Sequence, residues 1–248
     1  MKAILKQAAR RLGGHVFSDA SLPTGVDWLH DIRRSGVLGD APLCFDVGAN
    51  TGQTVARLLA IWPRARIHAF EPFAATHKAL VAATRDLPGV RPLPLALGAM
   101  PGRVQATASL DPLLSSLAFD PPPGMGGPAE TVRVETVDTY CAQHQLQEID
   151  VLKTDTEGWD LEVLRGAAGM LAQQRVHFVQ SEVSFEPGNR RNTPFRPLFD
   201  LLAANDYCFL GLYETWPLHH FAAPNLFCNA LFVSRPARER GRLRRVAG

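Results

Sequence analysis

Residues 149–167 read IDVLKTDTEGWDLEVLRGA, and this stretch passes from one kind of secondary structure to another. The first six residues form a largely apolar run that predicts a buried strand, and residues 160–172 have the spacing of an amphipathic helix. Asp155, Glu157 and Gly158 lie between the two elements. Two acids and a glycine after a core strand indicate that the core stops there and that a ligand site begins.

The chain before this stretch alternates expected strands and helices. The strands cover 42–47, 66–70 and 90–97, and the helices cover 26–37, 51–62 and 73–85. This order favours right-handed crossovers and a mostly parallel sheet with helices on both faces. After residue 172 we expect strands over 176–183, 207–212 and 226–233, and a helix over 195–204.

The segment between residues 98 and 148 is less regular. We expect short strands over 102–108 and 131–136 and a helix over 137–145. Between the strands, FDPPPGMGGP (119–128) is too rich in proline and glycine for regular structure. It is predicted to be a loop, either an inert one or a mobile one over a site.

Composition excludes several classes of protein. The 248 residues carry a net charge of +2, so no global positive charge attracts nucleic acid. No apolar stretch reaches the roughly 18 residues of a membrane span. The four cysteines lack C-x-x-C spacing, and we expect free thiols in a reducing compartment. We therefore predict a cytoplasmic protein with no nucleic-acid partner and no membrane span, and its oligomeric state stays open.

The turn after the first expected strand, FDVGANTGQT (45–54), is suited to binding a small anion. Gly48 and Gly52 allow a sharp turn and a close approach to a ligand, and the next helix presents free N–H groups. The turn lacks the G-x-G-x-x-G pattern of dinucleotide loops, so an amino-acid carboxylate suits it better than a pyrophosphate. Asp46 and Asn50 could meet an ammonium group or fix the loop itself.

Glu71 ends the second expected strand, 25 positions after Asp46. An acid at this place commonly accepts hydrogen bonds from ribose hydroxyls. A ligand that has a carboxylate, an ammonium group and a ribose is S-adenosylmethionine. We predict that it is bound by Asp46, Gly48, Asn50, Gly52, Glu71 and Asp155.

Four motifs together resemble the FkbM family of S-adenosylmethionine-dependent methyltransferases. They are FDVGANTGQT (45–54), FEP (70–72), VETVDTYC (134–141) and IDVLKTDTEGWDLEVLRGA (149–167). Family members read close to K-I-D-V-E-G where this chain has KTDTEG at 153–158, with threonine at the two usually apolar positions. The resemblance, over about residues 43–233, implies the Rossmann-like class I methyltransferase fold, with a seven-stranded sheet whose last strand is antiparallel. It also implies methyl transfer, usually to a hydroxyl of a sugar, glycan or polyketide-like small molecule.

Methyl transfer to an alcohol needs an aligned acceptor oxygen and a general base. The candidate catalytic residues are Asp155, Glu157 and Glu182. Each could instead have another role: Asp155 could hold the ammonium group, Glu157 could anchor the turn or cap the next helix, and Glu182 could pair with Arg190 or Arg191. A further candidate base is His219 or His220. We predict no metal ion, because no histidine joins the acids in sequence.

Two other functions compete with this one. A nicotinamide-dependent oxidoreductase is disfavoured, because the dinucleotide turn is absent. A non-catalytic binding module is disfavoured by the full set of acids and glycines. We divide the chain into an N-terminal helical extension (1–38), a methyltransferase domain (39–234) and a basic flexible tail (235–248).

Overall fold

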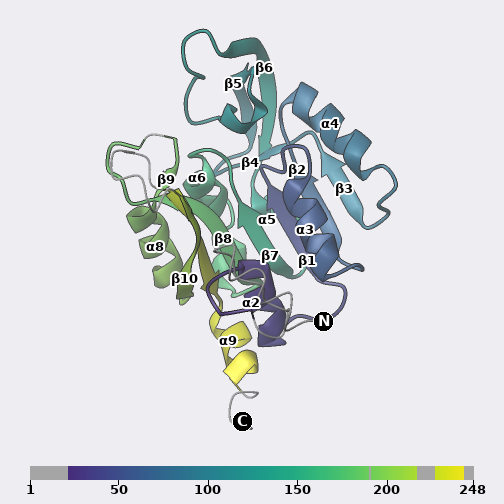
Figure 1. The fold of residues 1–248 in the computed structure, drawn as a ribbon, viewed down its shortest axis with the longest axis vertical. Helices are drawn as coiled ribbons and strands as arrows, with labels where there is room; N and C mark the ends of the chain where they lie inside the picture. Colours follow the sequence, from purple (N-terminus) through teal and green to yellow (C-terminus); the bar gives the residue numbers. More distant parts are fainter. Residues whose placement is uncertain (1–21, 190, 217–226, 243–248) are drawn as a thin grey trace, which may run out of the picture.

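The computed structural model describes residues 22–189, 191–216 and 227–242, and a large central β-sheet organises them (Figure 1). Its strands are β1 (Leu43–Val47), β2 (Arg66–Phe70), β3 (Val90–Leu93), β7 (Ile149–Thr154), β8 (Val176–Ser184), β9 (Thr193–Pro194), β10 (Cys208–Trp216) and β11 (Phe227–Val233). Their order is β10-β11-β8-β7-β1-β2-β3, with the two-residue β9 paired beside β8. Among these described strands, only β11 runs in the opposite direction to the rest, and it pairs antiparallel with β8 and with β10. The mostly parallel sheet with an antiparallel last strand is thus confirmed.

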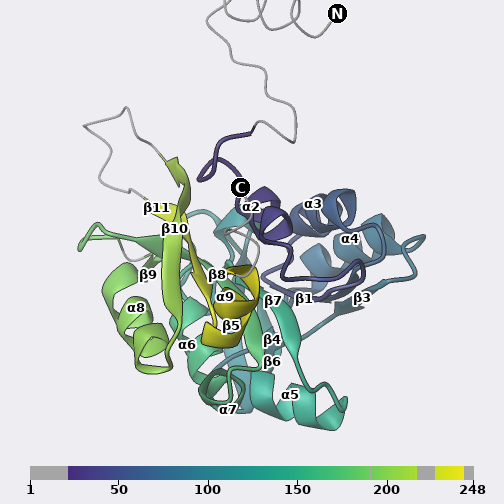
Figure 2. The same cartoon turned by 90° about the horizontal axis from the view of Figure 1, so that it is seen from below.

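Helices cover both faces of the sheet (Figure 2). One face carries α2 (Trp28–Ser35), α3 (Gln53–Ile61) and α4 (Ala74–Thr84), and the other carries α5 (Val137–Gln143), α6 (Asp160–Arg165), α7 (Ala168–Ala172) and α8 (Phe195–Ala204). The alternation of side chains along β1 supplies both cores. Phe45 and Val47 pack in the cluster that holds α5 to α8, whereas Cys44 packs with α2 to α4.

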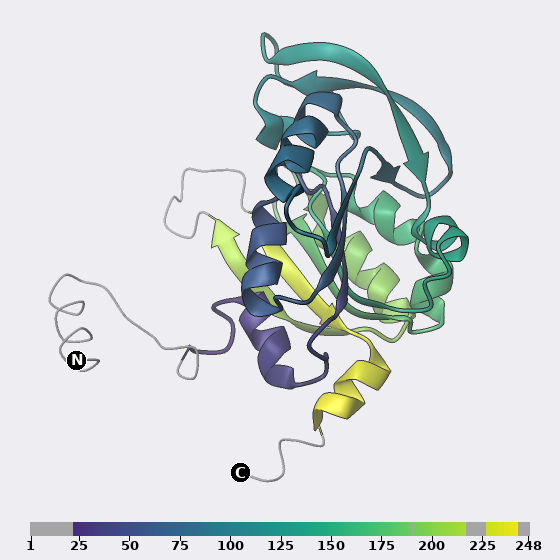
Figure 3. The ribbon, with the colours of Figure 1, turned by 90° about the vertical axis from the view of Figure 1, so that its right-hand side faces the viewer.

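The third expected strand is in fact two strands that belong to different sheets. After β3 the chain bends near Pro94, and β4 (Ala96–Leu97) leaves the main sheet to pair with β6 (Gly126–Glu135). Together with β5 (Gly102–Ser109) these strands form a three-stranded sheet at one end of the molecule (Figure 3). The predicted loop 119–128 therefore ends early, because β6 already begins at Gly126.

The predicted helix over 160–172 is interrupted. A β-carbon on Gly166 would lie 2.0 Å from the Gly98 carbonyl oxygen, so the backbones meet at this glycine and the chain divides there into α6 and α7. Through this contact, the helices α6 and α7 pack against the segment that leads into β5.

The basic tail also differs from the prediction. Residues Arg235–Arg242 form helix α9, and Ala237 is fully buried in the core that holds α2 to α4. The prediction of a flexible tail is therefore wrong for residues 235–242. The division of the chain into three regions stays a prediction. Residues 1–21 of the predicted N-terminal extension lie outside the described residues, as do His219 and His220. Across the described ranges, no helix combines the length and apolar character that crossing a bilayer requires.

Candidate active site

A cavity of about 560 Å³ lies where the parallel strands end. Its wall includes most of the residues predicted from the sequence: Gly48, Asn50, Glu71, Asp155, Glu157 and Glu182. These residues come from β1, β2, β7 and β8 or from the loops that follow, because parallel strands bring their carboxyl ends to the same edge. Asp46 and Gly52 are the two predicted residues that do not line the cavity.

The loop after β1 packs directly against the end of β7. Gly48 has φ +76°, and a β-carbon there would lie 1.9 Å from the Asp155 carbonyl oxygen. Only glycine fits this approach. Gly52, with φ +99°, forms the N-cap of α3 and starts the helix. Gln53 and Thr54, in the first turn of α3, line the cavity, so the free N–H groups of this turn lie beside it.

Glu71 follows β2 directly, and its side chain connects this strand end to the loop after β1 through hydrogen bonds. Its two carboxylate oxygens accept hydrogen bonds from the backbone N–H groups of Asn50, at 3.0 Å, and Phe73, at 3.1 Å. Burial raises the pKa of Glu71 to about 7, against the lowering effect of these two bonds. Each oxygen keeps a lone pair for a further donor, so this carboxylate can still accept hydrogen bonds from two ribose hydroxyls.

Asp46 does not line the cavity. Its side chain is fully buried and forms an ion pair with Lys153, whose Nζ lies 2.8 Å from Oδ1. The register of β1 and β7 places these two residues side by side. Lys153 also donates to the Gly48 carbonyl oxygen, at 3.1 Å, and lies 3.7 Å from Asp155. Asp46 therefore fixes the loop through Lys153, which is the alternative role expected for it.

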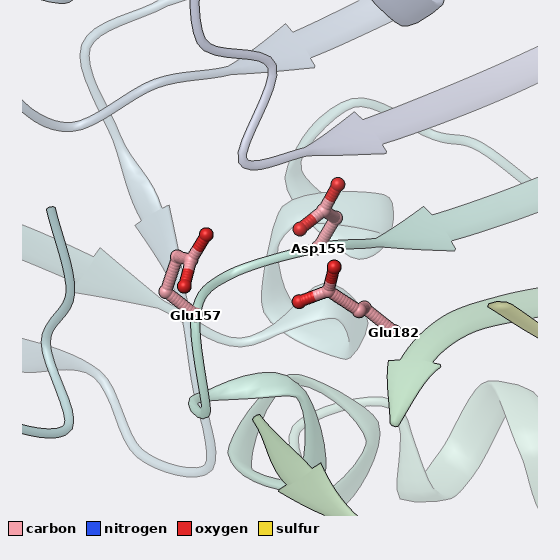
Figure 4. Close-up of side chains that lie close together, drawn as sticks. All are labelled: Asp155, Glu157 and Glu182. Atoms are coloured by element: carbon pink, nitrogen blue, oxygen red, sulfur yellow. The ribbon is translucent and has the colours of Figure 1, made fainter. Parts of the chain in front are cut away.

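The three candidate catalytic acids converge on one space (Figure 4). Asp155, Glu157 and Glu182 each offer a carboxylate oxygen, and these oxygens all lie within 4.8 Å of one another. Glu157 has φ +51° and the next residue, Gly158, has φ +93°, so a tight turn carries Glu157 back toward Asp155. Oxygen ligands at this spacing can also hold a divalent cation. That no metal ion is bound therefore stays a prediction.

The environment separates the acids electrostatically. Arg191 pairs with Glu157 at 2.9 Å, yet burial still raises the pKa of Glu157 to about 7. Burial, reinforced by Asp155 and the other nearby acids, raises the pKa of Glu182 to about 9. This shift favours the protonated form of Glu182. The Asn192 side-chain amide donates a hydrogen bond to it.

The loop after β8 contributes more to the cavity than the sequence indicated. Arg190 or Arg191 was expected as a partner of Glu182; Arg190 lies outside the described residues, and Arg191 binds Glu157. Asn189 and Asn192 were not recognised as cavity residues. No strand-end pattern marks them, because they lie five or more residues beyond β8. Trp159 was also missed; it lines the cavity and donates to the Leu97 carbonyl oxygen at 3.2 Å.

The segment that connects β5 to β6 forms one side of the cavity. The 3-10 turn η2 (Pro112–Leu114) and the residues that follow it line the wall. Asn50 donates to the Pro112 carbonyl oxygen at 3.2 Å, and Ser116 donates to the Glu157 carbonyl oxygen at 2.6 Å. The predicted loop 119–128 does not line the cavity; the segment just before it does.

Solved structures of methyltransferases resemble this fold at low sequence identity. TrmK of M. capricolum, in complex with S-adenosyl-homocysteine, aligns with 85% of this chain and 70% of its own at 8% identity and a TM-score of 0.48. A TehB-like SAM-dependent methyltransferase from Corynebacterium glutamicum aligns with 94% of this chain and 96% of its own, at 14% identity and a TM-score of 0.41.

Sequence comparison identifies the family. The 2-O-methyltransferase NoeI of Sinorhizobium fredii is 23% identical over 175 residues, which cover 65% of this chain and 71% of that protein. The methyltransferase FkbM domain matches residues 46–209, more than half of the chain. This range contains the loop after β1 and all three catalytic candidates. The chain belongs to the FkbM family of methyltransferases, and its methyl donor is S-adenosylmethionine.

Proposed function

We propose that this protein transfers a methyl group to a hydroxyl oxygen of a sugar, glycan or polyketide-like small molecule. The observation that carries the proposal is the position of Asp155, whose carboxylate lies in the cavity at the end of β7, directly beside the loop after β1. A general base that removes the proton of an alcohol must lie where the methyl donor meets the acceptor hydroxyl. The name of the relative, a 2-O-methyltransferase, also supports an oxygen acceptor.

The chain offers separate groups for each part of the donor. Glu71 would accept hydrogen bonds from the ribose hydroxyls, and the first turn of α3 would bind the carboxylate. Asn50 and Gly48 shape the loop between these two places. The wall near Leu95 and Leu97 is apolar and suits the adenine ring. Bound S-adenosylmethionine would supply a sulfonium methyl group; an acceptor oxygen would bond to the methyl carbon as the carbon–sulfur bond breaks, and S-adenosylhomocysteine would leave.

Asp155 is proposed as the general base. Its side chain is 39% exposed, so an acceptor can reach it, and the Lys153 ammonium group lies 3.7 Å from its carboxylate. As the acceptor oxygen bonds to the methyl carbon, Asp155 takes the hydroxyl proton and later releases it to water. General-base catalysis of this kind contributes about 10²–10⁴-fold to a rate.

Glu157 and Glu182 are proposed to hold and orient the acceptor. Glu157 is held by its ion pair with Arg191, and burial favours the protonated form of Glu182, so both differ from Asp155, whose side chain is the more exposed. A small polar acceptor suits this wall. Nucleic acid is predicted not to be the acceptor, because the net charge of +2 provides no general attraction for phosphates.

Two measurements test the proposal. Calorimetric titration with S-adenosylmethionine is expected to show micromolar binding for the wild type and for the control Glu148→Gln, whose side chain is 64% exposed outside the cavity, and none for Glu71→Ala. Mass spectrometry then follows the addition of one methyl group to sugars, glycans, polyketide alcohols and RNA. Asp155→Asn is expected to bind the donor but to lose about 10²–10⁴-fold in turnover. Absence of donor binding by the folded wild type, or transfer to RNA alone, would refute the proposal.

A further inference from the structure

We propose that the acceptor presents a vicinal diol, as a carbohydrate ring does, and that Asp155 and Glu182 each bind one of its two hydroxyl groups. This inference rests on the proposed function and narrows its acceptors. An isolated hydroxyl on an apolar framework would be a poor substrate. Asp155 acts on the hydroxyl that receives the methyl group, and Glu182 positions its neighbour.

The sheet places these two carboxyl groups side by side. Strands β7 and β8 are parallel neighbours, and Thr154 pairs with Ser181, so Asp155 and Glu182 are the next two residues in the same register. Their carboxyl oxygens lie within 4.8 Å of each other and point toward one space (Figure 4). Hydrogen bonds of about 2.7–2.8 Å from each carboxyl group can converge on adjacent hydroxyl oxygens at this separation.

The two groups differ in what they offer a hydroxyl. Asp155 is the more exposed of the two and lies 3.7 Å from the Lys153 ammonium group; in its proposed role as the base it is a carboxylate, which only accepts hydrogen bonds. Glu182 is buried and has no cationic partner within the described ranges; its contact is the Asn192 amide. As a protonated acid it donates one hydrogen bond and accepts others. The pair is thus complementary: one group takes a proton from a hydroxyl, while the other donates to the adjacent oxygen.

An acceptor with one hydroxyl would leave a buried donor without a partner. Glu182 is only 9% exposed, so water replaces a missing hydroxyl poorly. Sites built to hydrogen-bond a hydroxyl discriminate strongly against analogues that lack it. The rest of this wall is also polar: Asn189 and Asn192 are both buried, line the cavity and bond to each other at 2.7 Å.

The test compares acceptors that differ by one hydroxyl. The panel contains methyl glycosides of hexoses and 6-deoxyhexoses, each beside monodeoxy analogues, together with alcohols that carry a single hydroxyl. Release of S-adenosylhomocysteine and mass spectrometry report turnover by the full chain. We expect kcat/KM for a diol to exceed that of its deoxy analogue by about 100-fold or more. Equal turnover of diol and single-hydroxyl acceptors overturns the inference.

Two substitutions of Glu182 separate a positioning role from a base. Glu182→Gln keeps a hydrogen-bond donor and is expected to retain the preference for the diol. Glu182→Leu removes the polar atoms, and the preference is expected to fall toward one, while the control Glu148→Gln keeps it. If Glu182→Gln loses turnover as completely as Glu182→Leu, Glu182 is the base and the inference is wrong. Loss of transfer with a chelator, restored by Mg²⁺, also overturns it, because the acids then hold a cation.

A binding measurement covers the case in which no panel member is methylated. Saturation-transfer NMR with the S-adenosylhomocysteine complex detects glycoside binding without turnover. Weaker binding of the deoxy analogues, and of the diols to Glu182→Leu, supports the inference. Failure of every diol to bind overturns it. Failure of the proposed function looks different, because then the donor itself does not bind, or methyl transfer goes to an atom other than oxygen.

Discussion

Replacing Lys153 with methionine tests the charge pair that lies beneath the cavity. Lys153 and Asp46 are 5% and 0% exposed, and 2.8 Å separates their charged atoms. The substitution keeps most of the side-chain volume but leaves the carboxylate buried without its cation. Breaking a buried pair in this way costs about 3–5 kcal/mol. That is a large part of the roughly 5–15 kcal/mol by which a domain is stable.

Urea denaturation followed by circular dichroism measures this loss. With a slope of about 2–3 kcal/mol per molar urea, the midpoint is expected to fall by about 1–2.5 M. The double variant Asp46→Leu/Lys153→Met removes both charges and is expected to recover most of the stability, because no uncompensated charge is left. A loss below about 1 kcal/mol, typical of an exposed pair, would refute the reasoning. A double variant as unstable as the single one would refute it too.

The pH dependence gives a second check on the same variant. Burial raises the pKa of Asp46, and the substitution removes the cation that opposes this shift. The folded variant then binds a proton more tightly than the unfolded chain, so its deficit relative to wild type is largest at neutral pH and shrinks as the pH falls. The slope cannot exceed about 1.4 kcal/mol per pH unit for one proton. Midpoints at pH 5 and pH 8 are compared with those of the wild type.

Three further outcomes are expected. Glu71→Gln is expected to weaken S-adenosylmethionine binding by about 10–100-fold in calorimetry. Because burial raises the pKa of Glu71 to about 7, the affinity of the wild type should fall as the pH drops below 7, and the variant should lose this pH dependence. Gly48→Ala forces a β-carbon to within 1.9 Å of the Asp155 carbonyl oxygen and should destabilise the protein far more than Gly124→Ala, which has a similar φ of +80° but open space around it; thermal unfolding compares the two. Ala237→Asp places an unpaired charge in the core beneath α9 and should lower stability by about 3 kcal/mol or more in urea denaturation; an unchanged midpoint would mean that α9 is not docked there.

The carboxyl ends of the strands could be located from the sequence because the information is local. A short apolar run followed by glycines or acids is recognisable within about ten residues, and parallel topology brings such ends together. Strand-end chemistry therefore predicts a shared site for Gly48, Glu71 and Asp155, and all three line one cavity. Helical periodicity also predicted most of the helices that cover the main sheet, and the predicted bounds agree with the observed ones within a few residues.

The errors occurred where a distant segment decides the local structure. The helix over 160–172 is divided at Gly166 by the backbone at Gly98, far away in the sequence. Strand β4, which follows β3, belongs to the smaller sheet because it pairs with β6. Basic composition suggested a flexible tail, but Ala237 packs in the core and Arg235 forms an ion pair with Asp206, so α9 lies against the domain. Spacing within one segment carries no information about such partners.

The sequence by itself determined the class of fold, the edge of the sheet that holds the ligand and the acids available there, because strand-end chemistry and periodicity are properties of short segments. The tertiary structure alone decided what each acid can do. It buried Asp46 against Lys153, paired Glu157 with Arg191 and left Glu182 without a cation among the described residues. Charge state depends on burial and on neighbours brought from other strands and loops, so residues of one chemical type acquire different roles only when the chain is folded.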